Sequence, residues 1–399
     1  MKKGLTPSEC LVSGLCERSF LKLWTHPNPK GKNGKELCDC LIVCGPHIVI
    51  ISVKHNEYRD TGNPTGWERW TKAAIEKSAS QIWGAERWMK SARSVERQDG
   101  RVISLPLMPS RRYHRLAVAL GGKGEVPLKW GDFGNGFVHL CDEYSLEALF
   151  TALDTITDFV EFLGASEALV RNGVYPLFAG GGIEDLVALY MMKGRSFDFE
   201  VPEQGQPDML ILQDDLWRGF AQSEEFRRMR TDIEVSYAWD RLIDLLAEDL
   251  LSGGMFDMHS KEVTNNELAL VKMALEPRMN RSVLAKKFIE FFQKPDMRLA
   301  ARVVQGHSGS AYVFTAGSSQ DPEFRLRQLA LRCFVVRGRL PNTHTVVGIA
   351  TDHFGTSKIG YSCGIVYLHI PEWTQEDERK CQGIQKDLGY FESANWSAR

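Results

Sequence analysis

The pattern of hydrophobic and polar positions over the first 60 residues predicts a helix followed by an antiparallel hairpin. In "LTPSECLVSGLCERSFLKLW" (residues 5–24), Thr6 is a candidate N-cap, Pro7 stands at the first helical position and Glu9 completes a capping-box signature. Apolar residues then recur at helical spacing to the end of that segment. Two β-rich runs in "GKELCDCLIVCGPHIVIISVKHNE" (residues 34–57) flank a Gly-Pro turn, which predicts the hairpin.

The pattern further along the chain predicts a mixed α/β protein. We expect a helix from Trp67 to about Ala92, strands within 113–122 and 136–143, and a long amphipathic helix from about Ser145 to Val170. The next region is predominantly helical in pattern, and the last returns to strands with one or two helices. The expected organisation is therefore a domain at 1–172, a mostly helical region at 173–298 and an α/β domain at 299–399.

Composition places the chain among globular proteins. It has 399 residues, of which 43% are hydrophobic and 25% charged, and it is too long for one compact core. No apolar run is long enough to span a bilayer, and the N-terminus has no apolar signal core, so we expect a cytoplasmic protein with no membrane partner. The nine cysteines have no regular spacing, which agrees with a reducing compartment.

Charge is distributed unevenly along the chain. Residues 1–120 contain 20 Lys and Arg against 11 Asp and Glu, a net charge of +9, whereas the whole chain carries −2. A basic first third makes nucleic acid a candidate partner for that part. An uneven surface without a nucleic-acid partner explains the charges equally well.

Three polar residues stand out in the hairpin: Asp39, Ser52 and Lys54. If the turn contains an even number of residues, such as Gly45-Pro46, Asp39 lies on the same face of the hairpin as Ser52 and Lys54. An odd number would place Asp39 on the opposite face. A carboxylate beside an ammonium suits phosphodiester hydrolysis. The carboxylate can hold Mg²⁺, and the ammonium can position water or stabilise the negative charge that develops in the reaction. A structural salt bridge would use the same residues, and spacing alone favours that interpretation.

Several segments together resemble the PD-(D/E)XK nuclease superfamily: "GLCERSFLKLW", "ELCDCLIVCG", "IISVK" and "EKSASQIWGAERWM". The resemblance covers about residues 5–120 in the superfamily's αβββαβ order and implies a restriction-endonuclease-like N-terminal domain. It implies that Asp39 is the main metal ligand and Lys54 the catalytic lysine. It also implies that Glu17 completes the metal shell from the first helix and that Gln81 steadies the site or the phosphate.

One position departs from the superfamily pattern. Two residues before the lysine, where the superfamily has Asp or Glu, this chain has Ser52, and a hydroxyl is a poorer ligand for a hard dication. Glu17, Glu36 or Glu57 could supply the missing charge, the site could bind one metal weakly, or the domain could be an inactive binder. Glu36 lies three positions before Asp39, which puts it on the opposite pleat unless a bulge intervenes, so Glu17 is the preferred acid.

Other prominent side chains have structural interpretations. Cys38, Cys40 and Cys44 are spaced along one strand and are expected to be buried thiols, not zinc ligands. Tryptophans and arginines that could contact nucleic acid are as well explained by packing and surface charge: Trp67, Trp70, Trp83, Arg111, Arg112 and Arg115.

The expected function is that of a Mg²⁺- or Mn²⁺-dependent nuclease that acts on DNA in preference to RNA, by analogy in bacterial defence or DNA maintenance. The acidic remainder is expected to sense a ligand, recognise a partner or mediate assembly into a homo-oligomer. One alternative is a catalytically inactive scaffold that binds nucleic acid or protein, with Ser52 marking the lost activity. Another is a separate enzymatic activity in the C-terminal α/β region.

Overall fold

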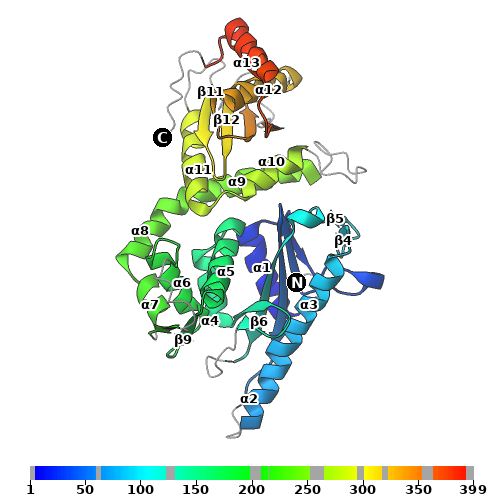
Figure 1. The fold of residues 1–399 in the computed structure, drawn as a ribbon, viewed down its shortest axis with the longest axis vertical. Coiled ribbons are helices and arrows are strands. Elements are labelled where there is room, and N and C mark those ends of the chain that lie inside the picture. Colours follow the sequence, from blue (N-terminus) through cyan, green and yellow to red (C-terminus); the bar gives the residue numbers. More distant parts are fainter. Residues whose placement is uncertain are drawn as a thin grey trace. The chain divides into compact units, whose positions relative to one another are not determined.

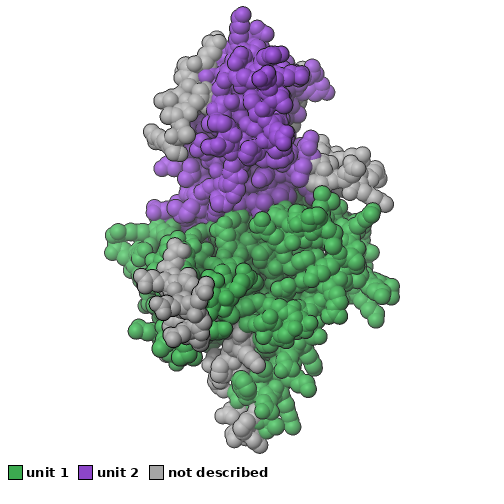
Figure 2. All heavy atoms as spheres, in the orientation of Figure 1, with its two compact units in different colours: residues 1–231 green, residues 232–399 purple. Residues whose placement is uncertain are grey.

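The computed structural model describes residues 5–59, 64–122, 131–197, 208–213, 215–251, 265–293, 301–316, 322–352 and 363–391. Within them the protein is mixed α/β with several separate sheets, as predicted. It divides into two compact units, residues 1–231 and residues 232–399 (Figure 2). The domain boundaries expected near residues 172 and 298 lie inside these units. No helix in the described part is long and apolar enough to cross a membrane.

A six-stranded mixed sheet is the centre of the first unit (Figure 1). Its strand order is β1-β2-β3-β6-β8-β7; β1, β2 and β3 are antiparallel neighbours, β3, β6 and β8 run parallel, and β7 is antiparallel to β8. The strand bounds are β1 (Thr25–Pro27), β2 (Cys40–Cys44), β3 (His47–His55), β6 (Arg112–Leu120), β7 (Gly131–Asp132) and β8 (Phe137–Cys141). The sequence pattern predicted neither β1 nor the small hairpin of β4 (Ser94–Glu96) and β5 (Val102–Ser104).

The predicted hairpin is formed by β2 and β3 with the even-numbered turn. Cys44 pairs with His47, so Gly45 and Pro46 alone make the connection, and Gly45 has a φ of 55° that favours glycine. Every residue of β2 is buried, as are the three cysteines Cys38, Cys40 and Cys44. Continued by one position beyond β2, the register places Asp39 across from Ser52.

Helices cover both faces of this sheet. α1 (Pro7–Phe20) lies on one face, and α2 (Pro64–Thr71), a π-helical turn (Lys72–Glu76) and α3 (Lys77–Met89) form the predicted long helix on the other (Figure 1). The predicted capping box is present: Glu9 N donates to Thr6 Oγ1 at 3.3 Å, and Thr6 N donates to Glu9 Oε2 at 3.0 Å. α1 ends before residue 24 because Leu21 takes a φ of 68°, outside the helical region.

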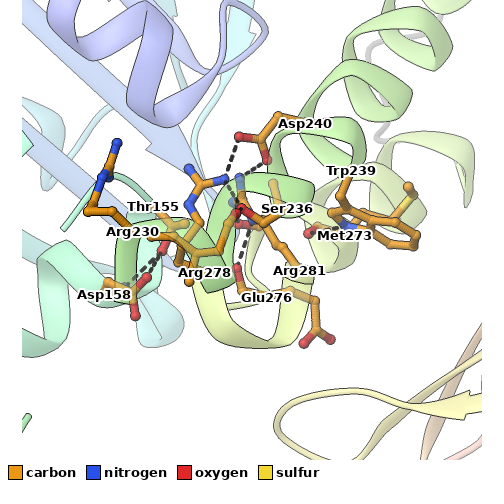
Figure 3. A network of polar contacts seen from close by, with 12 residues as sticks. Thr155, Asp158, Arg230, Ser236, Trp239, Asp240, Met273, Glu276, Arg278 and Arg281 are labelled. Carbon is orange, nitrogen blue, oxygen red and sulfur yellow. Dashed lines mark hydrogen bonds and ion pairs between the residues drawn. The ribbon is translucent and has the colours of Figure 1, made fainter. Parts of the chain in front are cut away.

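The helix predicted from about Ser145 to Val170 is two helices, α4 (Glu143–Ala152) and α5 (Ile156–Arg171). Thr155 starts the second: its Oγ1 accepts a hydrogen bond from Asp158 N at 3.1 Å and donates to Asp158 Oδ2 at 2.7 Å (Figure 3). The apolar stripe continues across the break, so periodicity alone does not reveal it.

The rest of the first unit is mostly helical, with a two-stranded parallel sheet that the sequence pattern did not predict. In that sheet β9 (Val174–Phe178) pairs with β10 (Asp208–Leu212), and one of its faces exposes Tyr175, Leu177, Met209 and Ile211. The helices are α6 (Ile183–Met192), α7 (Leu216–Ala221) and α8 (Glu224–Ile233), the last of which contains the boundary between the units.

The second unit has its own four-stranded sheet of order β11-β12-β13-β14. β12 and β13 are parallel and are joined through α12, while the outer pairs are antiparallel. Its elements are α9 (Tyr237–Leu251), α10 (Asn265–Ala274), α11 (Arg278–Phe292), β11 (Ala301–Gln305), β12 (Ser310–Ala316), α12 (Pro322–Arg339), β13 (Thr345–Thr351), β14 (Cys363–His369) and α13 (Gln375–Leu388). Strands and helices follow the order expected for the C-terminal region.

Buried charges connect the helices of the second unit (Figure 3). Asp240 Oδ2 accepts from Arg278 Nη1 at 2.7 Å and Asp240 Oδ1 accepts from Arg281 Nη1 at 2.6 Å. Both arginines are 1% exposed, so the carboxylate compensates two charges that water does not reach. Glu276, between α10 and α11, accepts hydrogen bonds from His307 N at 2.8 Å and Tyr312 Oη at 3.0 Å. These bonds connect the β11–β12 hairpin to the two helices.

Candidate functional site

The candidate site lies where the C-terminal end of β3 meets the N-terminal end of β2. The two strands are antiparallel, so Asp39, just before β2, comes close to the last residues of β3. The N-terminus of α1 reaches the same edge, because Ser8 Oγ lies 2.9 Å from His55 Nδ1. The parallel strands β6 and β8 also end there. Side chains from three separate segments, the residue before β2, the end of β3 and the start of α1, therefore lie at one edge of the sheet.

Four of the residues singled out from the sequence contact one another at this edge. Gln81 Oε1 accepts hydrogen bonds from Lys54 Nζ at 2.9 Å and from Ser52 Oγ at 3.0 Å. Lys54 Nζ also lies 3.4 Å from Asp39 Oδ2, and Val53 N donates to the same oxygen at 2.6 Å. The Asp39 side chain is 3% exposed and that of Lys54 is 30% exposed, so a buried carboxylate faces a cation that solvent can reach.

Regular geometry explains this convergence. Ser52 and Lys54 are two positions apart on β3, so they point to the face that α3 covers. On α3, Gln81 lies one turn from the buried Ser78 and Ala85, whose small side chains let the helix approach the sheet closely. Helical and strand periodicities therefore direct Gln81 and Lys54 to the same point.

Glu36 is the acid that contacts Asp39. Burial of its carboxyl group, the charge of Asp39 and a hydrogen bond to Asp39 together raise the pKa of Glu36 to about 7. β2 begins only at Cys40, and the chain bends at Asp39, so strand alternation does not extend back to Glu36. The expectation that Glu36 lies on the opposite pleat is wrong for this reason.

Glu17 is half-buried and belongs to α1, which lies on the opposite face of the sheet from α3, the helix that contains Gln81 (Figure 1). Its neighbour in the chain, Cys16, hydrogen-bonds to Cys40 there. No group of three or more Asp, Glu, His or Cys side chains in the described ranges is arranged to hold a metal ion. Asp39 and Glu36 therefore form a pair of carboxyl groups that Glu17 does not extend to three.

A pair of carboxyl groups is compatible with Mg²⁺. This ion is commonly held by one or two carboxylates and completes its octahedron with waters and substrate phosphates. Asp39 already accepts hydrogen bonds from Val53 N and Lys54 Nζ, which fix the position of its carboxylate. Asp39 and Glu36 are accordingly the residues that fit a hard dication at this edge.

The tryptophans considered as nucleic-acid contacts belong to the core. Trp70 is 5% exposed and its Nε1 donates to the carbonyl oxygen of Asn56 at 2.6 Å, while Trp67 and Trp83 pack against the cluster between α3 and the sheet. Of the three arginines, Arg111 donates to the carbonyl oxygens of Pro106, Ala92 and Met89, Arg115 pairs with Glu86, and Arg112 is exposed.

Searches with protein-family models and against curated proteins found no match for this chain. The functional argument therefore rests on the chemistry of the residues at the edge of the sheet. They offer two adjacent carboxyl groups, one ammonium within reach of both solvent and carboxylate, and an amide oxygen that fixes the ammonium.

Proposed function

We propose that the first unit hydrolyses phosphodiester bonds of nucleic acid, DNA in preference to RNA, with Mg²⁺ or Mn²⁺ as cofactor. One observation carries this proposal: Lys54 Nζ is held 3.4 Å from the buried Asp39 carboxylate and 2.9 Å from Gln81 Oε1, beside the second carboxyl group of Glu36. A paired acid and lysine at the open edge of a sheet suit metal-assisted hydrolysis of a phosphate ester.

The topology of the first unit supports the proposal. Apart from the small β4–β5 hairpin between α3 and β6, its first elements run α1, β1, β2, β3, the long helix made of α2 and α3, and β6, with an antiparallel triplet of strands followed by a parallel one. This order agrees with the αβββαβ arrangement of the PD-(D/E)XK superfamily that the sequence resembles. The net charge of +9 on residues 1–120, the part of the unit that carries the candidate site, favours an anionic substrate there.

In the proposed mechanism, Asp39 and Glu36 would hold the dication, which would polarise the phosphate and make water a better nucleophile. Val53 N fixes the orientation of the Asp39 carboxylate. The Lys54 ammonium stabilises the negative charge that develops on the phosphate, and Gln81 orients the ammonium.

Cleavage assays with near-isosteric variants test the proposal. The purified protein is incubated with supercoiled plasmid, single-stranded DNA or RNA, together with Mg²⁺, Mn²⁺ or EDTA. We expect metal-dependent cleavage of DNA that falls by at least about 100-fold in Asp39→Asn and in Lys54→Met, because each change removes a charge used in the transition state. Lys386→Met, on the exposed surface of the second unit, is the matched control and should retain full activity.

Cleavage that persists in both variants would place the chemistry elsewhere in the chain. Circular dichroism and thermal unfolding of the variants establish that lost activity does not reflect lost structure, since Asp39 is buried.

A second candidate function is that of a nucleic-acid-binding scaffold without catalysis. Ser52 supports it, because its hydroxyl group is fully buried and bonded to Gln81 where the superfamily carries a second acid. The scaffold predicts binding that weakens as salt rises, with no cleavage under any metal condition.

A further inference from the structure

His55 connects two hydrogen-bonding partners at the same edge of the sheet. Its Nδ1 lies 2.9 Å from Ser8 Oγ, in the first turn of α1, and its Nε2 lies 3.2 Å from Glu57 Oε1. Both distances are within hydrogen-bond reach, so the imidazole is oriented from both sides. The next residue of α1, Glu9, interacts electrostatically with Glu36, which links this group to the candidate site.

The partners determine where the imidazole carries its proton. A carboxylate only accepts hydrogen bonds, so Nε2 must carry a hydrogen to bond with Glu57. The Ser8 hydroxyl group can donate to an unprotonated Nδ1 or accept from a protonated one, so it accommodates both the neutral ring and the imidazolium ion. Nε2 therefore carries a hydrogen in both forms of the ring.

Exposure shows which member of the group a substrate can reach. Ser8 is 8% exposed, whereas the side chains of His55 and Glu57 are 50% and 56% exposed. The backbone after β3 is held in place by hydrogen bonds from Asn56 N to Leu120 O at 3.0 Å and from Tyr58 N to Gly121 O at 2.8 Å. Ser8 is thus buried, whereas His55 and Glu57 are both accessible on a fixed segment.

We propose that His55 is the general acid of phosphodiester cleavage, an inference that rests on the proposed function. Attack by water forms a bond from its oxygen to phosphorus, and the proton of that water passes to solvent. The bond between phosphorus and the leaving sugar oxygen breaks, and its electron pair remains on that oxygen. The Nε2 proton of the imidazolium ion then converts it to a hydroxyl group, and solvent reprotonates His55. Ser8 and Glu57 are positioning residues in this step.

A change of leaving group tests the role. A sugar alkoxide needs a proton when it departs, whereas p-nitrophenolate leaves without one. His55→Ala should cleave DNA about 100- to 10,000-fold more slowly than the wild type, the usual range for general acid catalysis. It should cleave thymidine 5′-(p-nitrophenyl phosphate) at nearly the wild-type rate. His344→Ala, at an exposed histidine of the second unit, is the control and should match the wild type on both substrates.

Asp39→Asn separates this inference from the function on which it rests. That variant should lose activity on both substrates, whereas His55→Ala should lose activity on DNA alone. Equal loss by His55→Ala on both substrates, or no loss on either, would overturn the general-acid role while leaving the nuclease proposal intact. A wild-type protein that cleaves neither substrate would overturn both.

Cleavage of the same two substrates by further variants tests the positioning roles of Ser8 and Glu57. Glu57→Gln and Ser8→Ala should reduce cleavage of DNA more than cleavage of the p-nitrophenyl ester, and by less than His55→Ala does. Covalent labelling of Ser8 by a fluorophosphonate probe, lost in Ser8→Ala, would show instead that Ser8 is a nucleophile activated by His55 and would overturn the proposal.

Discussion

At the residue scale, the two carboxyl groups of the candidate site have different surroundings. Asp39 accepts hydrogen bonds from Val53 N and Lys54 Nζ. Burial, together with the charge of Asp39 and a hydrogen bond to it, raises the pKa of Glu36 to about 7. The surroundings of Glu36, and not its residue type, therefore make it harder to ionise than a free glutamate.

Arg111 caps carbonyl groups at the C-terminal end of α3, and its removal should destabilise the first unit. Arg111 donates to the carbonyl oxygens of Pro106 at 2.6 Å and Ala92 at 2.9 Å, and also to that of Met89 at the last turn of the helix. Arg111→Met should lower the free energy of unfolding by about 1–3 kcal/mol, because carbonyl groups near the helix end lose their donors. Urea denaturation followed by circular dichroism measures the difference.

The neighbouring Arg112 is exposed and provides the comparison. Arg112→Met should change stability by less than about 0.5 kcal/mol. If both variants unfold at the same urea concentration, the helix end does not depend on Arg111.

Most residues of the site could be predicted because regular periodicity places them. Ser52 and Lys54 follow strand alternation, and Gln81 follows helical spacing. Glu36 could not be placed in this way, because the chain bends at Asp39, between Glu36 and β2, so strand alternation does not reach it. The distance between two side chains in irregular backbone is set by tertiary contacts, which a pattern of residues does not contain.

At the scale of elements, β3 and β6 begin with two histidines in contact. His47 Nδ1 lies 3.1 Å from His114 Nε2. Burial, with Arg112 nearby, lowers the pKa of His47 to about 4, and burial, with His47, His139 and two arginines nearby, lowers that of His114 to about 3. The two strands therefore pair in a state where both rings are neutral.

Acidification should destabilise this strand pair. In the unfolded chain these rings take up protons near the ordinary value of 6.5, whereas the folded rings resist protonation down to about 4. The unfolded state binds more protons in this window, so stability falls with decreasing pH, by about 1.4 kcal/mol per pH unit for each ring. Urea denaturation between pH 7 and pH 4 should show a shallower dependence in His114→Gln than in the wild type.

The exposed His344 serves as the control for this dependence. His344→Gln should leave the slope of stability against pH as it is in the wild type. An unchanged slope in His114→Gln would mean that the pair does not resist protonation in the folded protein.

Elements with strong local signals could be predicted, and those formed by distant pairing could not. The capping box of Thr6 and the two-residue Gly45-Pro46 turn are encoded by adjacent residues. The N-cap at Thr155 is also encoded locally, but apolar residues continue at helical spacing on both sides of it, so the pattern predicts one uninterrupted helix. β1 has only three residues and exists because it pairs with β2, a contact that its own sequence does not specify.

At the scale of the whole molecule, each unit has its own sheet and its own buried core. In the second unit, Asp240 compensates both Arg278 and Arg281. Asp240→Asn removes the carboxylate that both buried arginines contact and should lower the stability of this unit by about 3–5 kcal/mol. Hydrogen exchange should accelerate in α9, α11 and β12, while β2 and β3 of the first unit keep their protection.

The exposed pair of Arg327 and Glu323 provides a control, because both side chains are at least 75% exposed. Arg327→Met should alter exchange little, as expected for an ion pair in solvent. Acceleration of equal size in both units after Asp240→Asn would show that they unfold as one cooperative body.

The strand alternation that separates Lys54 from His55 has a consequence for substrate polarity. Consecutive residues of β3 point to opposite faces of the sheet, so the ammonium and the imidazole approach its edge from different sides. Under the proposed mechanism, a nucleic-acid strand that binds across that edge contacts the ammonium and the imidazole in a fixed order along its backbone. A strand that runs in the reverse 5′ to 3′ sense would present its departing oxygen to the wrong group, so the products should carry their phosphates at one end only.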